Sequence, residues 1–158
     1  MIAYMSLLKM KILKKALKLS FERFRPNSFQ RRYHFTIAFD VNKPILICQN
    51  NPIKVNHKAY RIGQQFNIKT YQDFPYVHSE SHLISKLLDR YNSIDTNLSI
   101  VNVRINRQGI ILLSKPCKNC QKILDAVGLK KVYWSIDENT FGSSDEIIEV
   151  EGLTVPMV

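Results

Sequence analysis

Residues 5–24 show the apolar period of an α-helix. Apolar residues recur every three or four positions, and lysines fill the opposite face. The apolar stripe comprises Met5, Leu8, Ile12, Ala16 and Leu19, widened by Met10, Leu13, Leu17 and Phe24. Arg25-Pro26-Asn27 ends the pattern, because proline cannot continue a helix. We therefore expect an amphipathic first helix that packs on the rest of the fold.

The rest of the chain combines short apolar strands with two helical stretches. Strands are predicted over 33–40, 45–48, 98–105, 110–113 and 131–135, with 146–150 as either a last strand or an edge segment. The first two strands form a hairpin. Helices are predicted over 78–91 and 117–127, and Gly128 ends the second. This order of elements predicts a mixed α/β layer architecture.

Residues 53–77 show no firm period. We interpret them as a long loop with a short helical turn near 58–61. A loop of this length in a compact domain is often functional. Its basic residues are candidate phosphate contacts, and they are Lys54, His57, Lys58 and Arg61.

The formal net charge of +10 over 158 residues is unevenly distributed. Residues 1–32 hold nine of the lysines and arginines and one acidic residue, so the remainder of the chain is nearly neutral. A helix packed on a sheet with solvated lysines explains this pattern. A surface for nucleic acid or for an anionic membrane is the alternative.

The sequence contains three cysteines, and Cys48 stands apart from the other two in an apolar run. An odd number of cysteines argues against a secreted disulfide scaffold and favours a reducing compartment. We therefore expect a cytoplasmic protein, or one of the host cytoplasm if the chain is viral. Lysines interrupt each early apolar stretch, so neither a signal peptide nor an integral membrane segment is predicted.

Two short motifs at predicted helix starts carry the chemistry. His78-Ser79-Glu80 begins one helix, and Pro116-Cys117-Lys118-Asn119-Cys120 begins the other. One imidazole and two thiols make three zinc ligands, which leaves the fourth tetrahedral position to water, as in catalytic sites. Helix N-termini are electropositive and favour the thiolate forms of Cys117 and Cys120. Glu80 is placed to exchange protons with the water.

Other interpretations of these residues exist. A single C-x-x-C is also compatible with a redox pair or with half of a structural zinc site, but the sequence has no second C-x-x-C. His82 is another candidate ligand, four residues after His78. The order of these residues is not the H-E-x-x-H of zinc proteases, so His82 is interpreted as an ordinary helix residue.

At these residues the chain resembles the zinc-dependent cytidine/deoxycytidylate deaminase superfamily, whose signature is H-x-E followed by P-C-x-x-C. The resemblance covers about residues 33–136 of a single domain 1–158, between a basic N-terminal helix (1–32) and a C-terminal segment (137–158). Residues 114–120 and 132–135 are most similar to phage and mobile-element members. The resemblance implies a three-layer α-β-α sandwich around a mixed sheet of about five strands. It also implies hydrolytic deamination, with zinc on His78, Cys117 and Cys120 and Glu80 as the proton shuttle.

Candidate substrate contacts follow from the same resemblance. Members often carry an asparagine after the second strand that contacts sugar or base, and Asn50 falls there, although a simple turn residue is the alternative. Trp134 or Tyr133 is a candidate to line the pocket. The alternative is that these residues are buried aromatic residues of a strand. Ser79 replaces the usual alanine, and Lys115 stands where an acidic residue is common. The interval of 39 residues from His78 to Cys117 is long.

Three functions remain open from the sequence. The first is deamination of a free nucleoside or nucleotide such as dCMP. The second is deamination of single-stranded DNA or RNA, suggested by the basic first helix. The third is a non-catalytic, zinc-stabilised binding protein, against which Glu80 argues. Homo-oligomerisation is frequent in the superfamily and is a further expectation.

Overall fold

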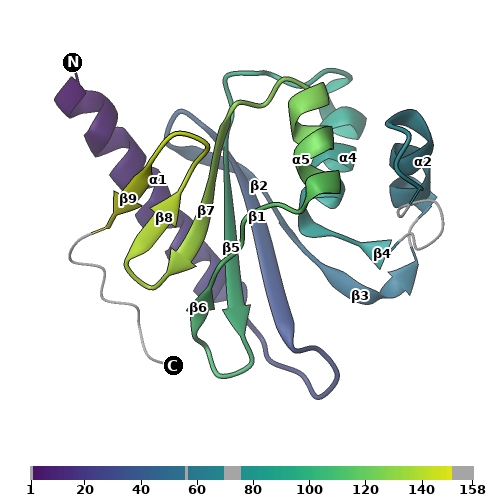
Figure 1. The fold of residues 1–158 in the computed structure, drawn as a ribbon, viewed down its shortest axis with the longest axis horizontal. Helices are drawn as coiled ribbons and strands as arrows, with labels where there is room; N and C mark the ends of the chain where they lie inside the picture. The colour runs from purple at the N-terminus through teal and green to yellow at the C-terminus, as the bar shows by residue number, and fades with distance from the viewer. Residues whose placement is uncertain (1, 56, 70–75, 151–158) are drawn as a thin grey trace.

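The computed structural model describes residues 2–55, 57–69 and 76–150. In these ranges the chain forms four helices and nine strands (Figure 1). The helices are α1 (Ile2–Arg23), α2 (His57–Gln65), α4 (Ser79–Tyr91) and α5 (Lys118–Ala126). The strands are β1 (Arg32–Asp40), β2 (Lys43–Gln49), β3 (Asn51–Val55), β4 (Tyr76–Val77), β5 (Ser99–Asn106), β6 (Ile111–Leu112), β7 (Lys131–Asp137), β8 (Thr140–Gly142) and β9 (Ile147–Glu149).

Seven of the described strands form one mixed sheet in the order β2-β1-β5-β7-β8-β9, with β6 paired to β5. Strand β1 is antiparallel to both β2 and β5, and the predicted β1–β2 hairpin is confirmed. Strands β5 and β7 run parallel, and their pairing ends at Asn102 opposite Trp134. Strands β3 and β4 form a separate antiparallel pair.

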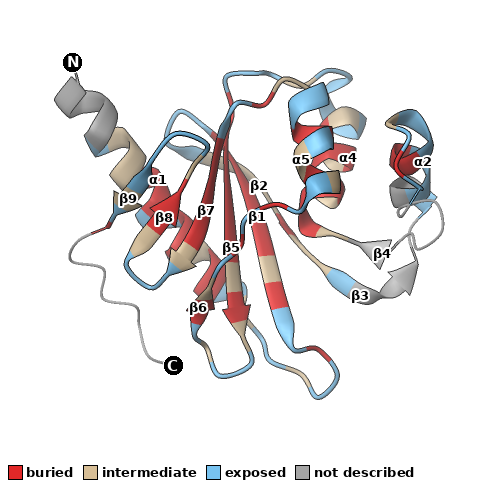
Figure 2. Ribbon diagram, viewed as in Figure 1, coloured by how far each residue is buried: buried red, intermediate tan, exposed pale blue. Residues whose placement is uncertain are grey.

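Helices cover both faces of the sheet, so the fold is the expected three-layer α-β-α sandwich. Alternate residues of β1 face opposite layers, because successive side chains of a strand point to opposite sides. Tyr33, Phe35 and Ile37 pack with α1. Ala38 belongs to the cluster on the other face, which includes Leu83 of α4 and residues of α2 and α5. Figure 2 shows the buried residues concentrated along the central strands between these layers.

Helix α1 buries its apolar stripe against the sheet, as predicted. Ile12, Leu13, Ala16 and Leu17 are buried, whereas the side chain of Met5 lies outside the described part of the chain. Lysines 11, 14, 15 and 18 are exposed on the opposite face. In residues 2–55, 57–69 and 76–150, no helix has the length and hydropathy that crossing a membrane requires.

The prediction of a long loop over 53–77 is wrong for most of its described residues. Helix α2 spans nine of them, and β3 and β4 pair at its two ends. The helix escaped detection because, among its residues whose burial is described, only Ile62 is an apolar core residue, and Gly63 follows in its interior. Residues 70–75 of the predicted loop lie outside the described part.

The sheet also has more strands than the five expected. Strand β8 is too short for alternation to be visible in the sequence. It passes so close to Trp134 that a Cβ on Gly142 would lie 2.5 Å from the indole Nε1. Glycine therefore permits β8 to pair with β7.

Candidate metal centre and cavity

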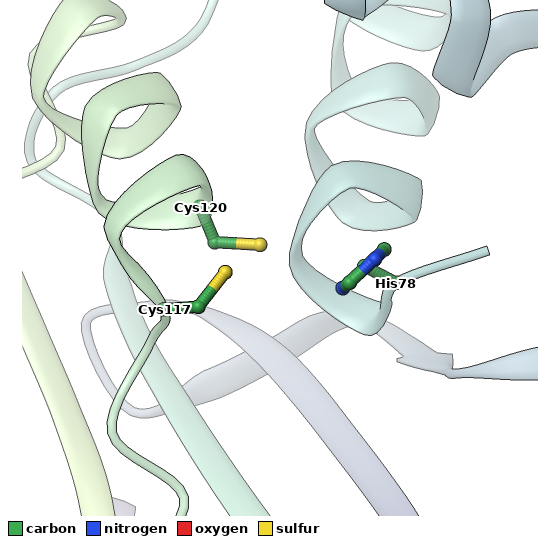
Figure 3. Close-up of side chains that lie close together, drawn as sticks. All are labelled: His78, Cys117 and Cys120. Carbon is green, nitrogen blue, oxygen red and sulfur yellow. The ribbon is translucent and has the colours of Figure 1, made fainter. Parts of the chain in front are cut away.

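His78, Cys117 and Cys120 come together at the N-terminal ends of α4 and α5. Their ligand atoms, one from each residue, all lie within 4.8 Å of one another, close enough to hold one metal ion. In Figure 3 the two sulfur atoms extend from α5 toward the first turn of α4, where His78 lies. His82 and Glu80 are not members of this cluster of described residues.

Local helix geometry explains this convergence. His78 and Cys117 are the N-cap residues of α4 and α5, and both have extended backbone conformations. Cys120 lies one turn into α5, so it shares a face with Cys117. Helix α5 connects β5 to the parallel strand β7, which places its N-terminus near the carboxyl end of their pairing, where α/β proteins commonly bind ligands.

The two kinds of cysteine in this fold differ in acidity. The pKa of Cys117 is lowered to about 6, mainly by a hydrogen bond from the Cys120 side chain and further by backbone N–H groups of Cys120 and Asn119. Partial burial and the Glu80 carboxylate oppose this shift. Burial instead raises the pKa of Cys48 to about 11. The exposed Cys117 is therefore ready to act as a thiolate ligand, whereas Cys48 stays protonated.

Glu80 is buried beside the cluster and is held by a chain of hydrogen bonds. Ser79 Oγ donates to Glu80 Oε1 at 2.7 Å. Thr36 Oγ1 of β1 lies 2.8 Å from Ser79 Oγ and 2.8 Å from Asn102 Oδ1 of β5, so its one proton can be donated to either. This chain links the carboxylate to the centre of the sheet and fixes its orientation.

The segment before α5 is anchored to the same strands. Ser114 Oγ donates to the carbonyl of Asn102 at 2.8 Å, and Asn102 Nδ2 donates to the carbonyl of Ser114 at 3.4 Å. The backbone N–H of Ser114 donates to the carbonyl of Ser135 at 2.8 Å, and the N–H of Ser135 donates to Ser114 Oγ at 2.8 Å. These bonds hold the approach to Cys117 in register with the sheet.

A cavity of about 590 Å³ opens at the cluster. Its volume lies in the range typical of small-molecule sites. Described residues from the α1–β1 connection, from β1, from the end of β2 and from both helix starts line it. They are Phe29, Gln30, Arg31, Arg32, His34, Asn50, His78, Ser79, Glu80, Lys115 and Cys117. The cavity thus brings a buried carboxylate, an imidazole and a thiol to one space.

The substrate-contact candidates lie in different surroundings. Asn50 lines the cavity, and its side chain also bonds to neighbouring backbone. It accepts from the N–H of His34 at 2.9 Å and donates to the carbonyl of Arg32 at 3.3 Å. Trp134 is 8% exposed and is not among the lining residues described. Its ring faces the ammonium of Lys115, 5.6 Å from the ring centroid.

The predicted phosphate contacts of 53–77 do not line the cavity where they can be described. His57 and Arg61 are exposed elsewhere, and the side chains of Lys54 and Lys58 lie outside the described part. Arg31, Arg32 and His34, which sequence reasoning missed, line it instead. The visible signal was the pair of arginines directly before the strand predicted over 33–40.

His34 faces the cavity from β1 and stays neutral near neutral pH. Burial is the main cause that lowers its pKa to about 4. The Glu80 carboxylate opposes the shift, while Arg104 and Arg32 add to it. A neutral imidazole beside Glu80 can donate a hydrogen bond to a bound ligand or accept one from it.

Comparison of the chain with protein-family models, with curated proteins and with solved structures found no match. The arrangement itself therefore carries the functional argument. A metal-binding cluster with a thiolate-prone cysteine borders a cavity in which a buried carboxylate is oriented by hydrogen bonds.

Proposed function

We propose that this chain is a zinc-dependent hydrolase that deaminates a cytosine-type base in a free nucleoside or nucleotide such as dCMP. The observation that carries the proposal is that Glu80, His78 and Cys117 line one cavity. The H-x-E and P-C-x-x-C motifs of the zinc deaminases supply the same residue types.

The donor set fits zinc. Thiolate sulfur is a soft ligand, and zinc accepts both sulfur and imidazole nitrogen, whereas magnesium and calcium prefer oxygen ligands. His78, Cys117 and Cys120 would hold the ion and leave one position for a non-protein ligand. Zinc bound there supplies activation of a water molecule for attack.

Glu80 carries the protons in this proposal. Its carboxylate takes a proton from the attacking water as the water oxygen bonds to C4 of the base. The carboxyl group passes this proton to N3 of the ring. The second proton of the water then goes to the amino group, which leaves as ammonia while C4 becomes a carbonyl. Cytosine and water give uracil and ammonia, so the atoms balance.

The hydrogen-bond chain supports this role for Glu80. Ser79 holds one carboxylate oxygen, Oε1, and Glu80 lines the cavity. Preorganised groups lower barriers because they need no reorientation during the reaction.

An ammonia-release screen tests the proposal. The substrates are cytidine, deoxycytidine, their monophosphates and a cytosine-containing single strand, with Glu80→Ala as the control. We expect ammonia and the matching uracil product from at least one substrate with the zinc-loaded protein and none with the variant. No release from any of these substrates would refute the proposal.

Deamination of a single strand is the second candidate. Phe29 favours it, because this aromatic ring is 63% exposed beside Arg31 and Arg32, and single-strand sites combine stacking rings with cations. The basic face of α1 adds little, since α1 packs on the sheet face opposite α4 and α5. A non-catalytic zinc protein is the third candidate, and it would leave the oriented Glu80 without a use.

A further inference from the structure

Three cations surround the mouth of the cavity without carboxylate partners. Arg31, Arg32 and Lys115 line it, and all three are exposed. Among the described residues, none of them forms an ion pair with an acidic side chain. Glu80 is the only acidic residue in the described lining, and it is buried, whereas the three cations are exposed. The mouth is therefore electropositive.

One neighbouring arginine, Arg104, lies outside the described cavity lining and adds positive charge near Arg32. Burial and then the Arg32 guanidinium lower the pKa of Arg104, which means that two arginines repel each other here. The Nε of Arg104 is buried and has no hydrogen-bond partner in the described part of the chain. A bound anion would relieve this repulsion.

The backbone that carries the two cavity arginines is already fixed. Asn27 Oδ1 accepts from the N–H groups of Phe29 and Gln30 at 3.2 and 2.7 Å. Arg107 donates to the carbonyls of Ser28 and Gln30 at 3.3 and 3.1 Å. A segment held in this way loses little conformational entropy on binding a ligand.

The segment that carries Lys115 is also held in place. Lys115 directly precedes Pro116 and Cys117, and Ser114 before it is bonded to Asn102 and Ser135. The ammonium group lies over the Trp134 ring. Lys115 is thus held in the cavity lining on a different segment from the arginines, at the position where deaminases often carry an acidic residue.

We propose that Arg31, Arg32 and Lys115 bind a phosphate group of the substrate, so that the cytosine enters as a nucleotide and not as a nucleoside. This inference rests on the proposed function, which places the base beside Glu80. The sugar and phosphate then extend toward the mouth. Arginine side chains suit phosphate oxygens because their N–H groups bind two oxygens at once, and a lysine adds a point charge.

The phosphate can come from two sources. One is the monophosphate of a free nucleotide, and the other is the phosphodiester of a single strand. Phe29 distinguishes them, since an exposed ring at the mouth can stack a neighbouring base that only the strand possesses.

Binding measured by calorimetry tests the proposal. The ligands are dCMP, deoxycytidine and a short single strand with one cytosine, each titrated into zinc-loaded protein. We expect dCMP to bind at least about tenfold more tightly than deoxycytidine, because charge-assisted bonds add to its affinity. Arg32→Gln combined with Lys115→Gln should remove most of this difference and leave deoxycytidine binding within about twofold.

Lys130→Gln is the matched control, because Lys130 is exposed and does not line the cavity. It should leave the binding of all three ligands unchanged. Equal affinities of the wild-type protein for dCMP and deoxycytidine would overturn the proposal. An equal loss of affinity for dCMP and deoxycytidine in the double variant would also overturn the proposal, because such a loss would indicate a general structural effect.

The strand titration identifies the source of the phosphate. If the strand binds more tightly than dCMP and Phe29→Ala reduces this affinity, the site binds a phosphodiester. If dCMP binds more tightly than the strand, the site binds a monophosphate. Failure of the proposed function can be distinguished from failure of the phosphate site. If only the proposed function fails, dCMP would still bind more tightly than deoxycytidine, but no uracil product would form. If uracil formed while both affinities were equal, the phosphate site would be refuted alone.

Discussion

The hydroxyl of Ser79 lies between the Glu80 carboxylate and the hydroxyl of Thr36. At this position an alanine would leave the carboxylate without that hydrogen bond. A hydrogen bond to a charged group is typically worth about 1.5–3 kcal/mol. Ser79 therefore acts as a positioning residue for Glu80 in the proposed reaction.

We expect Ser79→Ala to lower kcat by about tenfold to a hundredfold and to leave KM nearly unchanged, because the lost bond orients a proton carrier and does not bind substrate. Steady-state kinetics on the best cytosine substrate would measure both constants. Ser85→Ala, a buried serine of the same helix, is the control. Equal kcat values for the two variants would contradict the role given to Ser79.

Cysteine reactivity gives a second prediction at this scale. Near neutral pH the exposed Cys117 is mostly thiolate, since its pKa is about 6, whereas burial keeps Cys48 protonated with a pKa of about 11. Iodoacetamide should alkylate Cys117 first in the metal-free protein and leave Cys48 unmodified until unfolding. Peptide mass spectrometry would locate the modification. Early labelling of Cys48, or no protection of Cys117 by added zinc, would count against the account.

At the scale of elements, sequence periodicity was sufficient to predict a helix or strand where that element buries a broad apolar face. This holds for α1, α4, α5 and the central strands, whose bounds lie close to the predicted ones. It failed for α2, where Ile62 is the one core residue among those whose burial is described, and for β8, which has three residues. Their structure depends on tertiary contacts that a local pattern does not record.

The polar network behind the site had a visible but unused signal. Thr36, Asn102 and Ser135 each interrupt a run of apolar strand residues. A polar residue at such a position is buried and needs a partner. The metal ligands could be predicted because their motif is local, whereas the pairing of these three strands had to be known before the network could be drawn.

The contact between β8 and Trp134 predicts a defect in one element. Gly142→Ala would force the new Cβ against the indole and should destabilise the fold by about 1–3 kcal/mol. Urea unfolding would measure the loss, and the emission of Trp134, the single tryptophan, should shift. In Gly109→Ala the new Cβ meets nothing within 4 Å and strains only a positive φ, so emission should stay unchanged. Unaltered stability and emission in Gly142→Ala would disprove the close packing.

For the whole molecule, the sheet separates two surfaces. The basic face of α1 lies over one side, while the cluster and its cavity lie on the other. The sequence predicted the charge of α1 and its buried stripe correctly. It could not predict that cavity cations would come from residues 31, 32 and 115, because these meet only after β1 and the start of α5 are placed on the sheet.

The pH dependence of global stability tests the environment of His34. Its pKa of about 4 in the fold lies below the ordinary histidine value of 6.5, so the unfolded chain binds a proton first as pH falls. Above pH 6.5 His34 is neutral in both states and does not reduce the stability of the fold. As pH falls from 6.5 toward 4, protonation favours the unfolded state, and the free energy of unfolding decreases by up to about 3 kcal/mol. Urea unfolding of metal-free protein across this window should show a steeper decline for wild type than for His34→Gln. Parallel declines would contradict the burial of His34.

Isotope transfer from heavy-oxygen water tests the central claim most directly. Zinc-loaded protein is incubated with the cytosine substrate in labelled water, and the product is analysed by mass spectrometry. Hydrolytic deamination predicts a uracil product that carries one heavy oxygen, formed by wild type and not by Glu80→Gln with the same zinc content. A product without the label, equal formation by the Glu80→Gln variant, or no uracil product from any cytosine substrate would contradict the account.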